Sequence, residues 1–189
     1  MRTCAWCDGD LPERRTGRPG RFCSGKCRVA AHRASKLLPG VPVEMIGRAR
    51  WVRRDGKRPI TVDGRSASST NRSTWSPLRA VLESGAGDGF GFMLGSGIGC
   101  IDLDHCLTAD GPTDFAAAVL AACPATYVEV SPSGTGLHVF GLLPEGAGRK
   151  VPGAEVYSRA RFMTVTAEAF GGAPNTLGDL SQVAAALTA

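Results

Sequence analysis

The chain contains 189 residues, of which 43% are hydrophobic, and this is enough material for one ordinary domain with a small appendage. It contains no apolar run of the ~18 residues that a membrane span needs, and its first residues lack the apolar stretch of a secretory signal. We therefore expect a cytoplasmic protein without a membrane partner.

The net charge of +5 hides an uneven distribution along the chain. Residues 1–58 contain 15 of the 22 Lys and Arg but 5 of the 17 acidic residues, a local balance of +10 that leaves −5 for the remainder. A basic segment attracts polyanions through phosphate contacts, whereas an acidic segment that works beside nucleic acid needs cations. This asymmetry favours two modules, which we place at residues 1–38 and 39–189.

Four cysteines lie in two close pairs near the N-terminus. Cys4 and Cys7 are separated by two residues, and Cys23 and Cys27 by three. Four thiolates at this spacing commonly build a closed tetrahedral Zn²⁺ site, and so short a segment has too little apolar material to fold without metal. The spacing predicts a structural zinc; the alternatives are unligated thiols in an unfolded tail, or His32 in place of one cysteine. The remaining cysteines are expected to be free, buried thiols: Cys100, Cys106 and Cys123.

Basic side chains surround the paired cysteines, and residues 22–33 resemble a short zinc-binding element found at the start of many small actinobacterial and phage proteins. Arg and Lys contact phosphate oxygens whatever the base sequence, so such an element is suited to bind the DNA backbone. The alternative is a solvated basic face without a partner. The residues expected to contact DNA are Arg14, Arg15, Arg18, Arg21, Lys26, Arg28 and Arg33.

The segment that follows the cysteines begins with a helical pattern and then changes. Residues 27–36 are rich in helix formers, and residues 41–71 alternate apolar and basic stretches with Gly and Pro, as strands joined by turns do. Residues 73–83 predict a short amphipathic helix. Trp51 and Trp75 are candidates for the core or for base stacking, and we favour the core for Trp75 because it lies at the start of this helix.

The second half of the chain predicts strands flanked by helices. Residues 89–94 and 99–104 are expected to form a Gly-rich hairpin, and residues 155–157 and 161–166 a second strand pair. Further strands are expected at residues 127–130 and 137–140, and helices at residues 115–122 and 177–187. The expected class is therefore α+β, with a mixed or antiparallel central sheet.

Two aspartates lie at the end of an apolar strand pattern. Asp102 and Asp104 are two residues apart, so both side chains project from one face of a sheet. Neighbouring buried carboxylates are unfavourable unless a cation lies between them, and their oxygens are the ligands that Mg²⁺ or Mn²⁺ prefers. An Asp-x-Asp pattern alone also caps loops, so the pair needs support from the rest of the chain.

That support comes from two later segments. A turn rich in Gly and hydroxyl groups, which includes Ser133 and Thr135, precedes His138 and offers donors to a phosphate. Glu155 and Arg161 follow on the last predicted strands. Together these residues supply metal ligands, phosphate donors and a cation, the parts that phosphoryl transfer needs. Taken singly, His138 could be a core histidine, Glu155 a surface charge and Arg161 an ion-pair partner.

Three segments in this order resemble the bifunctional primase/polymerase domain of the archaeo-eukaryotic primase superfamily, as carried by phages and plasmids. They are Gly-Ile-Gly-Cys-Ile-Asp102-Leu-Asp104-His, Tyr-Val-Glu129-Val-Ser-Pro-Ser-Gly-Thr-Gly-Leu-His138 and Glu155-Val-Tyr-Ser-Arg-Ala-Arg161-Phe-Met-Thr-Val-Thr166. The resemblance covers residues 57–167. It implies a two-layer core related to the RNA-recognition fold, two-metal nucleotidyl transfer with Mg²⁺ or Mn²⁺, and nucleoside triphosphates and a single-stranded DNA template as partners. A separate replicative helicase is a further candidate partner.

The resemblance also assigns roles to single residues. Asp102 and Asp104 match the metal ligands of the first motif, Glu155 the third acidic position, and His138 the histidine that contacts the triphosphate. The family has a small hydroxyl residue two places before this histidine, where this chain has Gly136, so Ser133 or Thr135 is left to supply the hydroxyl. Arg161 matches a nucleotide-binding cation. Glu129 is either a ligand or a residue behind the ligands, and the sequence leaves both open.

Two other functions compete with this interpretation. The first is a non-catalytic, DNA-binding accessory module that acts with a helicase or initiator; carboxylates kept close together without a cation would destabilise such a protein for no purpose. The second is a metal-dependent nuclease or nicking initiator. That function needs a His-hydrophobic-His pair, which the three histidines, His32, His105 and His138, do not form.

Overall fold

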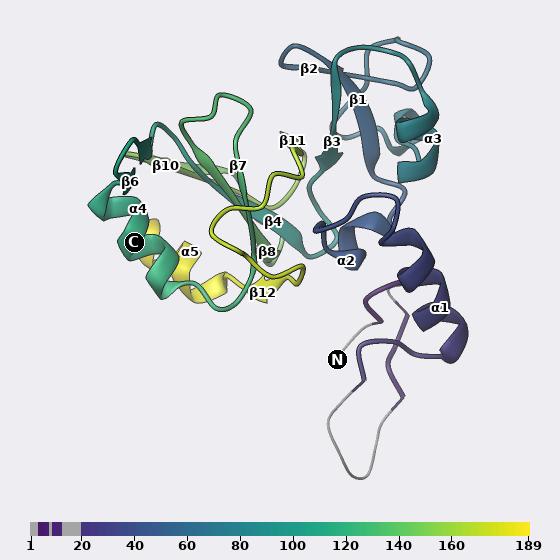
Figure 1. Ribbon diagram of the computed structural model, residues 1–189, viewed down its shortest axis with the longest axis horizontal. Helices are drawn as coiled ribbons and strands as arrows, with labels where there is room; N and C mark the ends of the chain where they lie inside the picture. The colour runs from purple at the N-terminus through teal and green to yellow at the C-terminus, as the bar shows by residue number, and fades with distance from the viewer. Residues whose placement is uncertain (1–3, 8, 13–19) are drawn as a thin grey trace.

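The computed structural model describes residues 4–7, 9–12 and 20–189, and the chain forms two lobes, each built around a sheet (Figure 1). The smaller lobe holds an antiparallel sheet of order β11-β3-β1-β2. Its strands are β1 (Trp51–Asp55), β2 (Arg58–Ile60), β3 (Gly89–Met93) and β11 (Phe162–Thr164).

The larger lobe holds a six-stranded sheet of order β12-β8-β4-β10-β9, in which β7 also pairs with β8. Its strands are β4 (Ile98–Leu103), β7 (Tyr127–Val130), β8 (Leu137–Leu142), β9 (Arg149–Val151), β10 (Ala154–Tyr157) and β12 (Gly178–Asp179). The pairs are antiparallel except β12 with β8. A separate small ribbon joins β5 (Leu107–Thr108) and β6 (Gly111–Pro112). The expected α+β class with a mixed sheet is confirmed.

Alternation along the strands gives the larger sheet two different faces. In β4, Ile98 and Cys100 point into a core shared with the smaller lobe, whereas Ile101 and Leu103 point the other way. The second face is covered by α4 (Asp114–Ala122) and α5 (Ser181–Leu187), on the side away from the smaller lobe (Figure 1). Asp102 continues the first face, so it lies where the core between the lobes ends.

The N-terminal element joins the smaller lobe. Its helix α1 (Gly25–Ala34) is capped by Ser24, whose hydroxyl accepts a hydrogen bond from the Cys27 N–H. Trp6 and Leu38 pack against the same core as two short helices, α2 (Val43–Ile46) and α3 (Leu78–Glu83). In the described part of the chain, no helix combines the length and apolar character that crossing a membrane requires.

The two expected strand pairs near the site are wrong. Strands β3 and β4 do not form a hairpin but belong to different sheets, because residues 95–97 all have positive φ and turn the chain from one lobe into the other. In the same way β10 pairs with β4 and β9, whereas β11 pairs with β3. The chain therefore crosses between the lobes at both places where a local hairpin was expected.

Helix boundaries also differ from expectation. The helix predicted from residue 73 begins at Leu78, because Pro77 disfavours helical backbone at Ser76, which instead forms a bridge with Trp51. A 3-10 turn, η1 (Arg72–Thr74), stands in its place, and Trp75 is half-buried outside the core. The closing helix starts at Ser181 because residues 178–179 pair with β8. The helix at 115–122 and the strands at 127–130 and 137–140 are confirmed.

Candidate active site

Five titratable residues form one row across the larger sheet. Strand register places Glu129 opposite His138, His138 opposite Asp102, Asp102 opposite Glu155, and Glu155 opposite Lys150. Neighbouring strands lie ~4.8 Å apart, so each side chain is next to its partner. The structure thus brings together residues from β7, β8, β4, β10 and β9 that are far apart in the sequence.

Three carboxylates in and beside this row form a compact group. Asp102, Asp104 and Glu155 each offer an oxygen, and the three oxygens lie within 4.8 Å of one another. Burial raises the pKa of Asp102 above its usual range. The like charges of Asp104 and Glu155 raise this pKa further, whereas His138 and Arg161 lower it in part. Hard oxygen ligands in this arrangement fit Mg²⁺ or Mn²⁺, which would relieve the repulsion.

Glu155 is held by cations as well as by its strand. Burial alone would raise its pKa, but hydrogen bonds from the Lys150 ammonium and the Tyr157 hydroxyl hold it below the usual range. Arg161 lies 3.7 Å from the Glu155 carboxylate and stacks on Tyr157, with its guanidinium carbon 4.3 Å from the ring centroid. Arg161 therefore lies beside the carboxylates and is positioned by the Tyr157 ring, with its side chain still exposed.

His138 is oriented by a fully buried carboxylate. Its Nδ1 lies 3.1 Å from Glu129 Oε1, while its Nε2 faces Asp102 Oδ1 at 3.7 Å. A carboxylate only accepts hydrogen bonds, so Nδ1 is the donor in this contact, which turns Nε2 toward the acidic group.

Glu129 itself is held by several donors. The Tyr127 hydroxyl donates to Oε2 at 2.9 Å, and the backbone N–H groups of Thr166 and Ala167 donate at 3.1 Å each. Burial raises the pKa of Tyr127 well above its usual range, so its hydroxyl keeps the proton that it donates. Glu129 lies behind His138 and outside the group of three carboxylates.

The turn before His138 carries a chain of hydroxyl groups. Ser133 Oγ lies 3.0 Å from both Ser131 Oγ and Thr135 Oγ1, and the Thr135 carbonyl accepts from Leu107 N–H at 2.9 Å, which holds the turn beside the segment after Asp104. Gly136 has no room for a side chain, because a Cβ there would lie 2.7 Å from the Leu103 carbonyl oxygen.

This turn also borders a cavity between the lobes. The cavity has a volume of about 390 Å³ and is lined by Ser131 and Gly134 of the turn, Arg54 and Phe90 of the smaller sheet, and Thr166. The cavity therefore lies beside the turn, and its lining does not include Asp102, Asp104 or Glu155.

The four N-terminal cysteines come together as the spacing predicts. Cys23 Sγ lies 3.6 Å from Cys7 Sγ and 3.5 Å from Cys27 Sγ, and the Cys23 N–H donates to Cys4 Sγ at 3.3 Å. Sulfur ligands ~2.3 Å from a tetrahedral Zn²⁺ lie ~3.8 Å apart, so the cluster fits this ion. His32 is exposed on α1 and outside the cluster. Cys100 and Cys106 are buried free thiols as expected, and Cys123 is half-buried.

The cysteine cluster needs a cation to ionise fully. Burial raises the pKa of Cys4, but hydrogen bonds from the backbone at Cys7, Cys23 and Trp6 lower it to about 6. Hydrogen bonds with the neighbouring thiols of Cys27, Cys7 and Cys4 raise the pKa of Cys23 to about 12.

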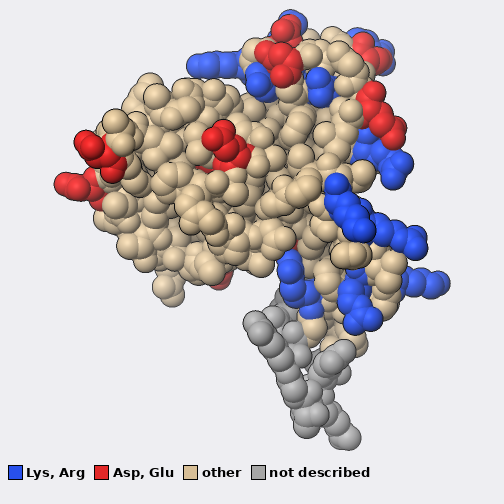
Figure 2. Space-filling view, in the orientation of Figure 1, with Lys and Arg blue, Asp and Glu red and all other residues tan. Residues whose placement is uncertain are grey.

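The expected DNA-contacting residues have mixed environments. Arg14, Arg15 and Arg18 lie outside the described residues. Arg21 forms an ion pair with Glu44 of α2 at 2.7 Å, which ties the cysteine loop to the smaller lobe. Lys26, Arg28 and Arg33 are exposed on α1. Figure 2 shows Lys and Arg gathered around this helix and the smaller lobe, whereas much of the visible face of the larger lobe is uncharged.

Comparison with known proteins adds one finding. The chain is similar to a DNA primase-polymerase. This relative, from Nitratiruptor phage NrS-1, is 36% identical over 143 aligned residues, which cover 66% of this chain. The chain spans 20% of the length of the phage protein. No protein-family model matches the chain.

Some residues of the site were not found from the sequence. No sequence motif indicated the residues that hold the carboxylates in place. These are Lys150 and Tyr157, which donate to Glu155, and Tyr127, which donates to Glu129. Two of them follow from strand alternation once the row is known, because Tyr157 and Tyr127 lie two residues from Glu155 and Glu129 on the same face. Lys150 depends on the pairing of β9 with β10, which no local pattern indicated.

Proposed function

We propose that this chain is a template-directed nucleotidyltransferase, a DNA primase, a DNA polymerase or both, that acts in phage, plasmid or mobile-element DNA replication through divalent-metal catalysis. The observation that carries the proposal is the group of Asp102, Asp104 and Glu155 beside an oriented His138. The similarity to a phage DNA primase-polymerase supports it.

The carboxylates would hold the catalytic cations. When bound, two Mg²⁺ or Mn²⁺ ions would neutralise charge on the triphosphate and activate the attacking hydroxyl. Asp102, Asp104 and Glu155 would be the ligands, because one oxygen of each lies within 4.8 Å of the others.

The groups around the carboxylates would bind the incoming nucleotide. His138 Nε2 contacts the triphosphate, with its ring orientation fixed by Glu129. The hydroxyls of Ser133 and Thr135 and the guanidinium of Arg161 bind phosphate oxygens. These groups are held in place before substrate arrives, so little reorganisation is needed at the moment of reaction.

The N-terminal element would engage the template. In this proposal residues 1–38 form a zinc-binding basic module, with Cys4, Cys7, Cys23 and Cys27 as ligands, and residues 39–189 form the primase-polymerase domain. Basic residues of the module contact the phosphates of single-stranded DNA. A separate replicative helicase is a partner that would supply the single strand.

The test is direct incorporation of nucleotides. Purified chain is incubated with single-stranded template, Mg²⁺ or Mn²⁺, and labelled ribo- or deoxynucleotides, first without and then with a primer. Template-dependent incorporation that Asp102→Asn abolishes is the expected result. A chain that binds the template but incorporates no nucleotide under any of these conditions would instead be a DNA-binding accessory module.

A further inference from the structure

A second cavity, which is lined by several arginines, lies at the opposite end of β4 from the carboxylates. Its volume is about 300 Å³, and three arginines, Arg48, Arg50 and Arg72, line it together with Trp6, Trp75 and Ser96. Ser96 lies in the turn just before β4, and the strand positions from Ile98 to Asp102 span ~13 Å, so the cavity and the carboxylates lie at opposite ends of β4. Its residues come from the cysteine element, the smaller lobe and the crossover between the lobes.

Arg50 is a fixed, buried cation in this cavity. Its Nε donates to the Met93 carbonyl at 2.6 Å, its Nη2 to the Leu94 carbonyl at 2.7 Å and its Nη1 to Ser96 Oγ at 3.2 Å. The guanidinium carbon lies 4.4 Å from the centroid of the Trp75 ring. Burial, and then the nearby charges of Arg72 and Arg48, lower the pKa of Arg50 to about 10, which still leaves it charged at neutral pH.

The positive charge of the cavity is not cancelled by an ion pair to Arg50. Neutral carbonyl and hydroxyl oxygens hold its guanidinium, and within the described residues no carboxylate lies within ion-pair distance of Arg50 or Arg72. Glu145 is the acid that acts on Arg50 through space, and its carboxylate accepts from the Ser96 N–H at 2.6 Å. Arg50 and Arg72 therefore place two positive charges close together, and this arrangement favours the binding of an anion.

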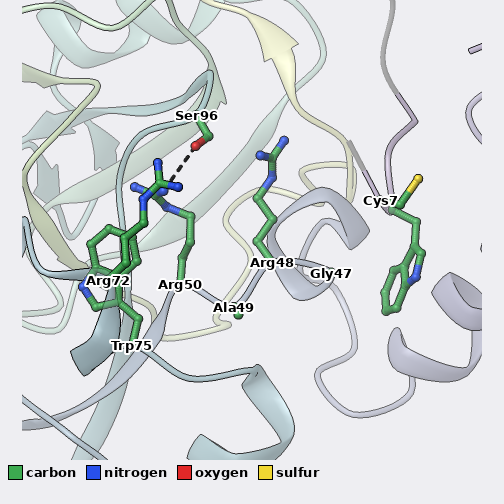
Figure 3. Close-up of a pocket in the computed structure, with 9 residues that line it drawn as sticks. Cys7, Gly47, Arg48, Ala49, Arg50, Arg72, Trp75 and Ser96 are labelled. Atoms are coloured by element: carbon green, nitrogen blue, oxygen red, sulfur yellow. Dashed lines mark hydrogen bonds between the residues drawn. The ribbon is translucent and has the colours of Figure 1, made fainter. Parts of the chain in front are cut away.

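Arg72 is the exposed cation of the group. Figure 3 shows its side chain extending beside that of Arg50 and in the same direction as Arg48. Its backbone belongs to the η1 turn, which Asn71 caps by accepting from the Ser73 N–H at 3.1 Å. Trp75 forms a rigid wall behind it, because the indole N–H donates to the Ser68 carbonyl at 2.7 Å.

We infer that this cavity binds a backbone phosphate of single-stranded nucleic acid, as a contact separate from the carboxylate site. The inference rests on the proposed function for the nature of the polyanion. A strand, rather than a free nucleotide, is favoured because basic residues continue beyond the cavity: exposed Arg33 and Arg79 line the neighbouring hollow, and Lys26 and Arg28 follow on α1.

The experiment measures binding without catalysis. Fluorescence anisotropy of the full zinc-loaded chain with a labelled single-stranded oligodeoxynucleotide, in the absence of Mg²⁺ and nucleotides, gives Kd at several salt concentrations. Arg72→Gln is expected to weaken binding about three- to tenfold. It should also reduce the slope of log Kd against log salt concentration by about one, as the loss of one phosphate contact would. Arg72→Glu should weaken binding further. Arg65→Gln, which removes an exposed arginine paired with Asp63, is the matched control and should leave Kd unchanged.

Three outcomes separate the possibilities. Unchanged Kd and salt dependence in both Arg72 variants overturn the inference. If these variants bind DNA normally but lose binding of a labelled nucleoside triphosphate added alone, the cavity is a free-nucleotide site, and the inference is again overturned. If the wild-type chain incorporates no nucleotides, the proposed function is contradicted. If Arg72→Gln nevertheless weakens DNA binding, the inference that the cavity binds a backbone phosphate is supported.

Discussion

Glu129 Oε1 lies 3.1 Å from His138 Nδ1 across the β7–β8 pair, and the same carboxylate accepts the backbone N–H groups of Thr166 and Ala167. One buried side chain therefore orients the histidine and also fastens the segment that returns from the smaller sheet. We predict that Glu129→Gln, whose amide would direct a donor at one of these N–H groups, lowers the free energy of unfolding by about 1–3 kcal/mol.

The same variant should also raise KM for nucleotide more than it lowers kcat, because the orientation of His138 is loosened while the carboxylate ligands remain. Thermal unfolding and steady-state incorporation measure the two effects. Glu83→Gln, an exposed acid on α3, is the control and should change neither. An unaltered KM in a destabilised Glu129→Gln protein would leave Glu129 with a purely structural role.

Asp102→Asn should separate catalysis from stability. Loss of one metal ligand is expected to reduce incorporation on the order of a hundredfold or more. The metal-free protein should become more stable, because Asp102 is largely buried beside the charges of Asp104 and Glu155. Thermal unfolding in chelator, with Asp110→Asn as an exposed control, measures this. Near-normal synthesis by Asp102→Asn would reject the assignment of the carboxylates.

Cys23→Ser should release zinc and unfold the N-terminal element, because ligation supplies most of the folding free energy of so small a segment. The two sheets have cores of their own and should persist. Template binding should weaken and depend less on salt, and priming without a primer should fall more than extension of a primer. Zinc content by mass spectrometry and the two assays test this, together with a chain that starts at residue 38. Equal priming by the truncated and full chains would contradict it.

Gly47→Ala should disturb the contact between the cysteine element and the smaller lobe. A Cβ at this position would lie 2.7 Å from the Trp6 carbonyl oxygen and 3.0 Å from the Trp6 ring. We expect destabilisation of about 1–3 kcal/mol. Gly25→Ala, in the first turn of α1 where a Cβ meets nothing within 4 Å, should be neutral or slightly stabilising. Thermal unfolding of the two variants makes the comparison, and equal effects would show that Trp6 does not dock as described.

The sequence predicted the parts of the site that depend on local alternation. Alternation places Asp102 on the face opposite Ile101 and Leu103, whichever strands pair with β4. Asp104 lies just after the last residue of β4, and its carboxylate still lies beside that of Asp102 as expected. The sheet membership of neighbouring strands was not predictable in the same way, because the positive φ at Ser96 that turns the chain into the second lobe has no sequence signature beyond its flanking glycines. Trp75 was misplaced for a related reason: its position depends on a stacking partner, Arg50, distant in sequence.

The row of Glu129, His138, Asp102, Glu155 and Lys150 makes the site sensitive to chain length within the strands. Side chains exchange faces with every residue of slip, so one residue inserted before Asp102 in β4 would turn it toward α4 and α5 and put an apolar neighbour in its place. Two inserted residues would restore the face but shift the carboxylate by ~7 Å along the sheet, beyond the reach of His138. Length changes compatible with activity should therefore occur in the connections, such as residues 105–113, and not in the strands that carry the row.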